Sequence, residues 1–151
     1  MTTARERFDE LRRTVRIPYD DLEQFWSTLQ PVVVDFMIGE WRASDLPTGH
    51  RSDGFLGDSW FGTNFNSATD VQPIICVDAD GKKFENTTLM KGGASLWMEE
   101  FRGEVTATMV YDAMPIHDHF KRIDDDAVLA IMNGKGALDN GRHMYFFLER
   151  L

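Results

Sequence analysis

"EVTATMVYDAMPIHDHFKRI", residues 104–123, contains two segments in which successive side chains alternate between opposite faces of an extended chain. Such alternation with period two predicts β-strands, and Pro115 marks the turn between them. The first segment, "VTATMVY", has the small and apolar residues expected of a barrel interior, and one of its faces carries Val105, Ala107, Met109 and Tyr111. The other face carries Thr106, Thr108, Val110 and Asp112.

Short segments with a strand-like pattern make up most of the chain. After Gly39, short alternating or apolar segments are separated by Gly, Asp and Asn, as in "PIICVD", "DADGKK" and "KKFENTTLM", which predict a hairpin. Many short strands without helices between them favour an antiparallel meander closed as a barrel. "GKGALDNG", residues 134–141, has glycines but no following helix and is interpreted as a hairpin loop.

The first part of the chain has helical periodicity instead. Thr3 with Glu6, and Asp20 with Glu23, are typical of capping boxes. Pro31 is expected to kink or split the second helix. We therefore expect a mainly β (α+β) fold in a single domain, residues 1–151, with a helical segment over 1–37 and a barrel over 38–151.

The amino-acid composition limits which binding partners the protein can be expected to have. The 151 residues carry 16 Lys and Arg against 25 Asp and Glu, a formal charge of −9, which disfavours nucleic acid and anionic membranes. Cys76 is the only cysteine, residues 1–16 lack the apolar region of a secretory signal and no stretch is apolar over the length of a bilayer span, so a cytoplasmic location is expected. A homodimer is expected from the narrow apolar stripe of the first helix: Phe8, Leu11 and Val15.

Residues 38–62, "IGEWRASDLPTGHRSDGFLGDSWFG", resemble the GXWXG domain family. The matching features are the Gly39–Trp41 opening, the Pro47–His50 turn, Asp53–Gly54 and the Trp60–Gly62 segment. The C-terminal part, residues 99–151, resembles the uncharacterised domain that usually follows it. Two departures stand out: Ala43 replaces the last glycine of the motif, and His117 replaces an aliphatic residue.

The Gly-x-Trp opening after a helix also resembles the first strand of lipocalin-like barrels. The resemblance implies a lipocalin-like antiparallel barrel whose cup holds one small apolar ligand. Within that cup we expect five substrate-binding residues: Trp41, Trp60, Tyr111, Phe120 and Met109.

The four histidines suggest where proton transfer takes place. In the strand after Pro115, His117 and His119 share one face with Lys121 and Ile123, and Asp118 shares the opposite face with Ile116, Phe120 and Arg122. We expect the histidine face to point into the cup, with His117 or His119 as the proton-transfer group. Asp118, His50 and Asp45 are the further candidates for catalytic residues.

Other interpretations of the histidines stay open. The His-x-His face can be a solvated strand face, and His50 can brace its turn. A metal site would require a third ligand such as His143 or His50. The Asp124–Asp126 run is interpreted as a solvated turn.

These observations leave three hypotheses for the function. The resemblance extends to bacterial terpene-epoxide ring-opening lyases such as α-pinene oxide lyase, which implies a lyase or isomerase that uses acid/base chemistry, without cofactor or metal, on a small hydrophobic molecule. A histidinium or carboxylic acid would protonate the epoxide, aromatic faces would stabilise the cation and a base would remove a proton. The alternatives are a non-catalytic carrier of a small apolar ligand and a heme or metal protein.

Overall fold

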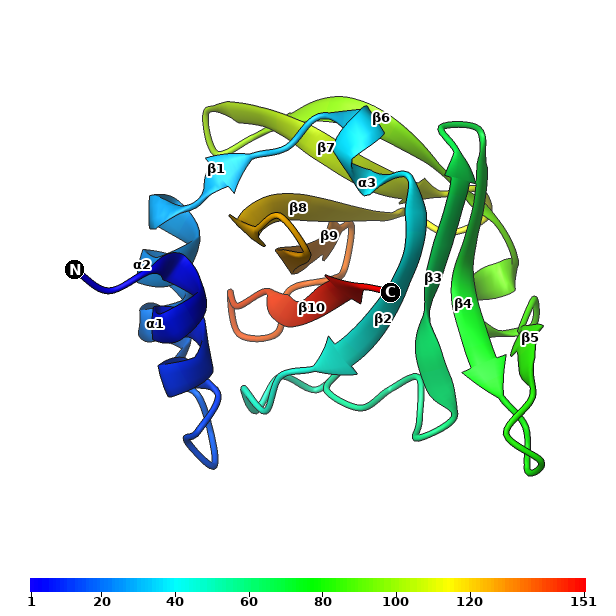
Figure 1. Ribbon diagram of the computed structural model, residues 1–151, viewed down its shortest axis with the longest axis horizontal. Coiled ribbons are helices and arrows are strands. Elements are labelled where there is room, and N and C mark those ends of the chain that lie inside the picture. Colours follow the sequence, from blue (N-terminus) through cyan, green and yellow to red (C-terminus); the bar gives the residue numbers. More distant parts are fainter.

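Three helices precede most of the strands in the computed structural model, which describes residues 1–151 (Figure 1). The helices are α1 (Ala4–Leu11), α2 (Tyr19–Thr28) and α3 (Val34–Met37), and a short strand, β1 (Gln30–Pro31), lies between α2 and α3. The other strands are β2 (Gly39–Asp45), β3 (Trp60–Ser67), β4 (Asp70–Val77), β5 (Lys83–Glu85), β6 (Ala94–Phe101), β7 (Glu104–Tyr111), β8 (Ile116–Asp124), β9 (Ala127–Gly134) and β10 (Met144–Arg150), with a 3₁₀ turn at Leu89–Lys91.

Eight of these strands close into a lipocalin-like antiparallel barrel. The order around the ring is β8, β7, β6, β4, β3, β2, β10 and β9, and β9 pairs again with β8. The predicted hairpin between "PIICVD" and "KKFENTTLM" is confirmed, because β5 pairs with β4 from Val77↔Lys83 to Ile75↔Glu85. Gly62 on β3 passes so close to β2 that a Cβ there would lie 1.9 Å from the carbonyl oxygen of Trp41, so only glycine fits.

A seam in the barrel wall is filled by β1. β7 pairs with β8 only over Thr108–Val110 and His117–His119. Beyond that stretch β8 pairs with β1, through Gln30↔Arg122 and Pro31↔Lys121. Pro31 therefore lies in a short strand and not in a kinked helix, since α2 already ends at Thr28.

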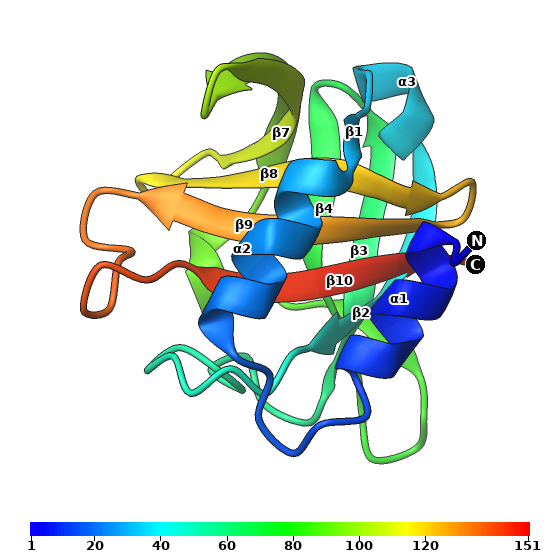
Figure 2. The same cartoon turned by 90° about the vertical axis from the view of Figure 1, so that its left-hand side faces the viewer.

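The helices α1 and α2 lie across the outside of β8, β9 and β10 (Figure 2). α1 begins with the expected capping box of Thr3 and Glu6. The second expected box is absent: α2 starts after Pro18 without a side-chain cap, and Glu23 instead accepts hydrogen bonds from Arg102 and Tyr145. None of the helices is long and apolar enough to cross a bilayer.

This arrangement creates two separate cores. One fills the barrel and includes Trp41, Phe65 and Phe120. The other lies between the helices and the outer barrel wall and includes Phe8 and Phe25. The apolar stripe that was expected to dock on a second chain is thus partly used within the chain: Phe8 is fully buried and only Val15 is exposed at the end of the stripe. A homodimer stays a prediction, but the apolar stripe of α1 no longer supports it.

The expected orientation of the histidine face was wrong. Ile116 and Phe120 belong to the barrel core, whereas Ile123 belongs to the core under the helices. The His117–His119–Lys121–Ile123 face of β8 therefore points out of the barrel, and Asp118 shares the inward face. The reason is that α1 and α2 cover the outside of β8, so that both faces of the strand are largely buried.

Candidate active site in the barrel

A largely apolar cavity of about 210 Å³ opens within the barrel. Eleven of its fifteen lining residues are hydrophobic, so the cavity suits an apolar ligand. Its wall combines Trp60 on β3, Tyr111 at the end of β7, Met132 on β9 and Phe146 on β10. The rings of Trp60 and Phe146 meet edge to face with centroids 5.8 Å apart, which holds both aromatic faces in place.

Asp118 brings a carboxyl group into this apolar surface. The residue is only 3% exposed, and its Oδ1 is buried without a hydrogen-bond partner. Burial raises the pKa of the Asp118 carboxyl to about 8, because an apolar environment disfavours the charged form. Asp118 is therefore mostly protonated at neutral pH, and it can donate a proton or a hydrogen bond.

A second polar atom of the cavity wall also lacks a partner. The Nε1 of Trp60 is buried and forms no hydrogen bond, and an indole N–H is a donor only. Buried polar groups without partners are costly, so a ligand oxygen that accepts from them gains binding energy. Two residues of the apolar wall, Asp118 and Trp60, thus each have one buried hydrogen-bonding atom without a partner.

Tyr111 is the third polar group of the wall. Its pKa is raised, first by burial and then by the charge of Asp118, so the phenol stays protonated and its ring stays uncharged. Because Tyr111 and Asp118 line the same cavity from adjacent strands, the aromatic face and the acid are available to the same ligand.

The other expected substrate-binding residues lie deeper. Trp41, Met109 and Phe120 belong to the barrel core and do not line the cavity. The indole N–H of Trp41 donates to the carbonyl oxygen of Met37 at 2.8 Å, which ties α3 to the barrel. Their contribution is to pack the barrel that shapes the cavity.

The two histidines of β8 lie outside the cavity. His119 stacks on Phe101 with ring centroids 4.1 Å apart, and its nitrogens bond Thr108 and Asn133 at 2.8 and 3.0 Å. Burial, together with the nearby charges of His117, His143 and Arg102, lowers the pKa of His119 to about 4. His117 pairs with Glu99 on the outer surface at 2.7 Å. Their catalytic role stays a prediction that this geometry does not support.

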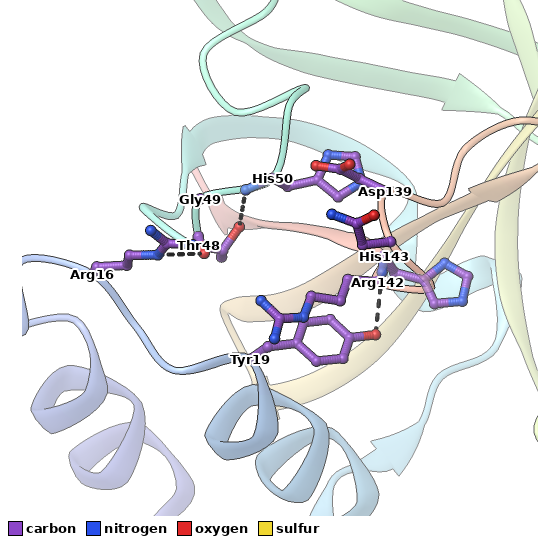
Figure 3. A pocket seen from close by; sticks show the side chains of 9 residues that line it. Arg16, Tyr19, Thr48, Gly49, His50, Asp139, Arg142 and His143 are labelled. Atoms are coloured by element: carbon purple, nitrogen blue, oxygen red, sulfur yellow. Dashed lines mark hydrogen bonds between the residues drawn. The ribbon is translucent and has the colours of Figure 1, made fainter.

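His50 and Asp45 lie in different places. His50 lines a separate polar pocket, shown in Figure 3, and its Nε2 lies 3.2 Å from the carbonyl oxygen of Ala137. Its Nδ1 accepts a hydrogen bond from the backbone N–H of Ser52 at 3.0 Å, so His50 braces its turn. Asp45 lines an open depression beside Gly54, and burial raises its pKa.

The donors needed for heme or a metal are not gathered in the cavity. None of the four histidines lines it, so no imidazole is placed to ligate a heme iron there. No cluster of three His, Cys, Asp or Glu side chains that could hold a metal ion occurs in the molecule. The residues present therefore do not fit either group.

Sequence reasoning found Asp118 but assigned it no specific task, and it missed most of the cavity wall. The available signal was an acidic residue between Ile116 and Phe120 on a strand face. No comparable signal marked Met114, Met132, Met144 or Phe146, because apolar residues in strands are common whether or not they border a cavity.

A closed antiparallel barrel with an apolar cavity and one buried acid fits the class of small-ligand-binding or lyase-like proteins. Residues 24–81 match the family model described as GXWXG protein, and residues 92–150 match a domain of unknown function, DUF4334. The chain belongs to the GXWXG family, with the DUF4334 domain as its C-terminal part.

A solved structure extends this relationship over nearly the whole chain. The crystal structure of a protein from Thermomonospora curvata is 35% identical, covers 98% of this chain and 98% of its own, and superposes with a TM-score of 0.87. None of the curated proteins matches the chain.

Proposed function

We propose that the protein is a lyase or isomerase that needs no cofactor and opens a small hydrophobic molecule by acid/base chemistry in the barrel cavity. The observation that carries this proposal is Asp118, a buried carboxyl with an unpartnered oxygen and a pKa raised to about 8, in an otherwise apolar wall. A carboxyl group that is neutral at neutral pH in such a place is suited to general acid catalysis.

The reaction that suits this cavity is the ring opening of an epoxide. The Asp118 carboxyl donates its proton to the epoxide oxygen as one carbon–oxygen bond breaks, which leaves a hydroxyl group and a carbocation. The aromatic faces of Trp60, Tyr111 and Phe146 stabilise that cation. The Asp118 carboxylate then removes a proton from a carbon next to the cation, and a double bond forms. The acid is regenerated and the product is an isomer of the substrate.

The substrate is a compact apolar molecule with one oxygen. The cavity of about 210 Å³ exceeds the engineered apolar cavity of about 150 Å³ that binds benzene in another protein. Asp118 and Trp60 both line the cavity and each has a polar atom without a partner, which suits a ligand with one oxygen. Terpene epoxides such as α-pinene oxide combine these properties, in line with the resemblance to terpene-epoxide lyases.

Incubation with monoterpene epoxides, read by gas chromatography, tests the proposal. The parent protein should convert at least one epoxide to an isomer. Asp118→Asn keeps the shape of the side chain but cannot transfer a proton at neutral pH, so turnover should fall by about 10²–10⁴-fold.

Asp112→Asn is the matched control, because Asp112 is an exposed aspartate just beyond β7. Its turnover should equal that of the parent. Full activity of Asp118→Asn on a substrate that the parent converts would exclude Asp118 as the acid.

A second candidate function is a non-catalytic carrier, which the same apolar cavity favours. A carrier would bind epoxides or the related hydrocarbons without converting them. Saturable binding in the parent without any product would decide for the carrier.

A further inference from the structure

A polar pocket of about 230 Å³ lies outside the barrel cavity (Figure 3). It is enclosed by the Pro47–His50 turn, the start of α2 and the loop that leads into β10. Only one of its nine lining residues is hydrophobic, in contrast to the apolar barrel cavity. The proposed ring-opening chemistry makes no use of this pocket.

One wall carries Arg16, whose side chain contacts the Thr48–Gly49 turn. The Nε of Arg16 donates to the carbonyl oxygen of Thr48 at 3.2 Å. Its guanidinium lies directly over Gly49, where a Cβ would come within 2.2 Å of it. Asp53 holds the turn itself, since its carboxylate accepts from the backbone N–H groups of Thr48 and Gly49 at 2.9 and 2.8 Å.

Another part of the wall carries a second arginine, Arg142, which directly follows a tight hairpin turn. Arg142 follows the Asn140–Gly141 turn, and the backbones of Asp139 and Arg142 exchange hydrogen bonds of 2.9 and 3.0 Å. An Asn-Gly pair with positive φ at both positions is the favoured two-residue hairpin turn. The Arg142 guanidinium lies 5.5 Å from the centre of the Tyr19 ring.

The two arginines that line this pocket have no carboxylate partner. Asp139 already pairs with Arg51, through its carboxylate at 3.8 Å and through the backbone N–H of Arg51 at 2.9 Å. Neither Arg16 nor Arg142 forms an ion pair, although the chain carries a net charge of −9. Two further acids lie nearby: Asp53, whose carboxylate accepts from the backbone of the Thr48–Gly49 turn, and Asp20, which is exposed and lines the adjoining depression.

We propose that this pocket is a binding site for a small oxyanion, the carboxylate or phosphate group of a polar metabolite, held between Arg16 and Arg142. A guanidinium presents planar, always protonated N–H donors that match the oxygens of carboxylate and phosphate. The Arg16 guanidinium is already hydrogen-bonded to the carbonyl oxygen of Thr48, which reduces the ordering needed when the anion binds. The site is independent of the barrel cavity and of the reaction proposed for it.

Calorimetric titration of the full chain with inorganic phosphate and, separately, with succinate tests this site at constant ionic strength in chloride. At least one of the two should bind saturably, and the stronger one identifies the phosphate or the carboxylate as the preferred group. Arg16→Gln and Arg142→Gln should each weaken that binding by about tenfold or more, because each removes a charge-assisted hydrogen-bonding group.

Two further variants separate charge from position. Arg13→Gln removes an arginine that lies outside the pocket and should leave the affinity unchanged. Gly49→Ala keeps every charge but displaces the Arg16 guanidinium, so it should weaken binding as well. The proposal is overturned if neither anion binds saturably, or if Arg13→Gln weakens binding as much as the two pocket variants.

Discussion

Asp118 illustrates how one residue combines a cost in stability with a chemical use. A buried carboxyl without a hydrogen-bond partner opposes folding when it is charged, and the group responds by staying protonated. An ordinary Asp, with a pKa near 3.9, would be a carboxylate at pH 7 and could not act as an acid. The same burial that raises the pKa therefore supplies the acid form.

The rate of epoxide opening should depend on pH through Asp118. With a pKa of about 8, the active protonated form dominates below neutral pH, so kcat/KM should be flat there. Above pH 8 the acid form is lost, and kcat/KM should fall by about tenfold for each pH unit. A pH–rate profile of the parent checks this.

The exposed-aspartate variant Asp112→Asn should reproduce that profile. A rate that rises as pH increases through 8 would contradict the assignment. It would mean that the active form of Asp118 in the free protein is the carboxylate and not the carboxylic acid.

At the scale of the element, β8 explains both what the sequence predicted and what it could not. Alternation correctly sorted Ile116, Asp118 and Phe120 onto one face and His117 and His119 onto the other. A period of two assigns residues to a common face, but it identifies the inner face only when the outer one is polar. On β8 the outer face is covered by helices and holds buried His119 and Lys121. The polarity of the two faces therefore did not reveal which of them faces the cavity.

The seam between β7 and β8 depends on one side chain. The hydroxyl of Thr106 accepts from the backbone N–H of Val32 at 3.0 Å and lies 2.5 Å from the carbonyl oxygen of Phe120. It thereby joins three chain segments where the direct pairing of β7 with β8 has ended.

Thr106→Val should destabilise the protein by about 1–3 kcal/mol, because it leaves buried backbone groups without partners while keeping the side-chain shape. Urea denaturation measures this difference. Thr87→Val is the control, since Thr87 is exposed and its substitution should change the unfolding free energy by less than about 0.5 kcal/mol. Equal stability of the Thr106 and Thr87 variants would show that the seam does not depend on the Thr106 hydroxyl.

At the scale of the whole molecule, the barrel brings together residues that no local pattern connects. The cavity wall joins Trp60, Tyr111, Asp118 and Phe146, which come from four different strands. Strand periodicity, the capping box at Thr3 and the turn signals predicted the architecture, because these are local properties. The surroundings of Asp118 depend on how distant strands close the ring, so its burial and raised pKa could not be read from the sequence.

The division into two cores separates stability from ligand binding. Phe8 on α1 is fully buried in the outer core, where it stacks with Phe25 at 5.8 Å and meets Phe147 edge to face at 5.0 Å. None of these residues lines the barrel cavity. A change at Phe8 should therefore alter the attachment of the helices and leave the cavity intact.

Phe8→Ala should lower the free energy of unfolding by about 3–5 kcal/mol, the usual cost of removing a buried phenylalanine ring. Under conditions where the variant remains folded, its affinity for an apolar ligand of the barrel cavity should equal that of the parent, because Asp118 and Trp60 keep their surroundings. Val15→Ala provides the control within the same apolar stripe: Val15 is 96% exposed, so its loss should change stability by less than about 0.5 kcal/mol. Urea denaturation and ligand titration of both variants measure the two effects. If folded Phe8→Ala lost ligand affinity in step with stability, the two cores would be coupled, and the helices would help to shape the cavity.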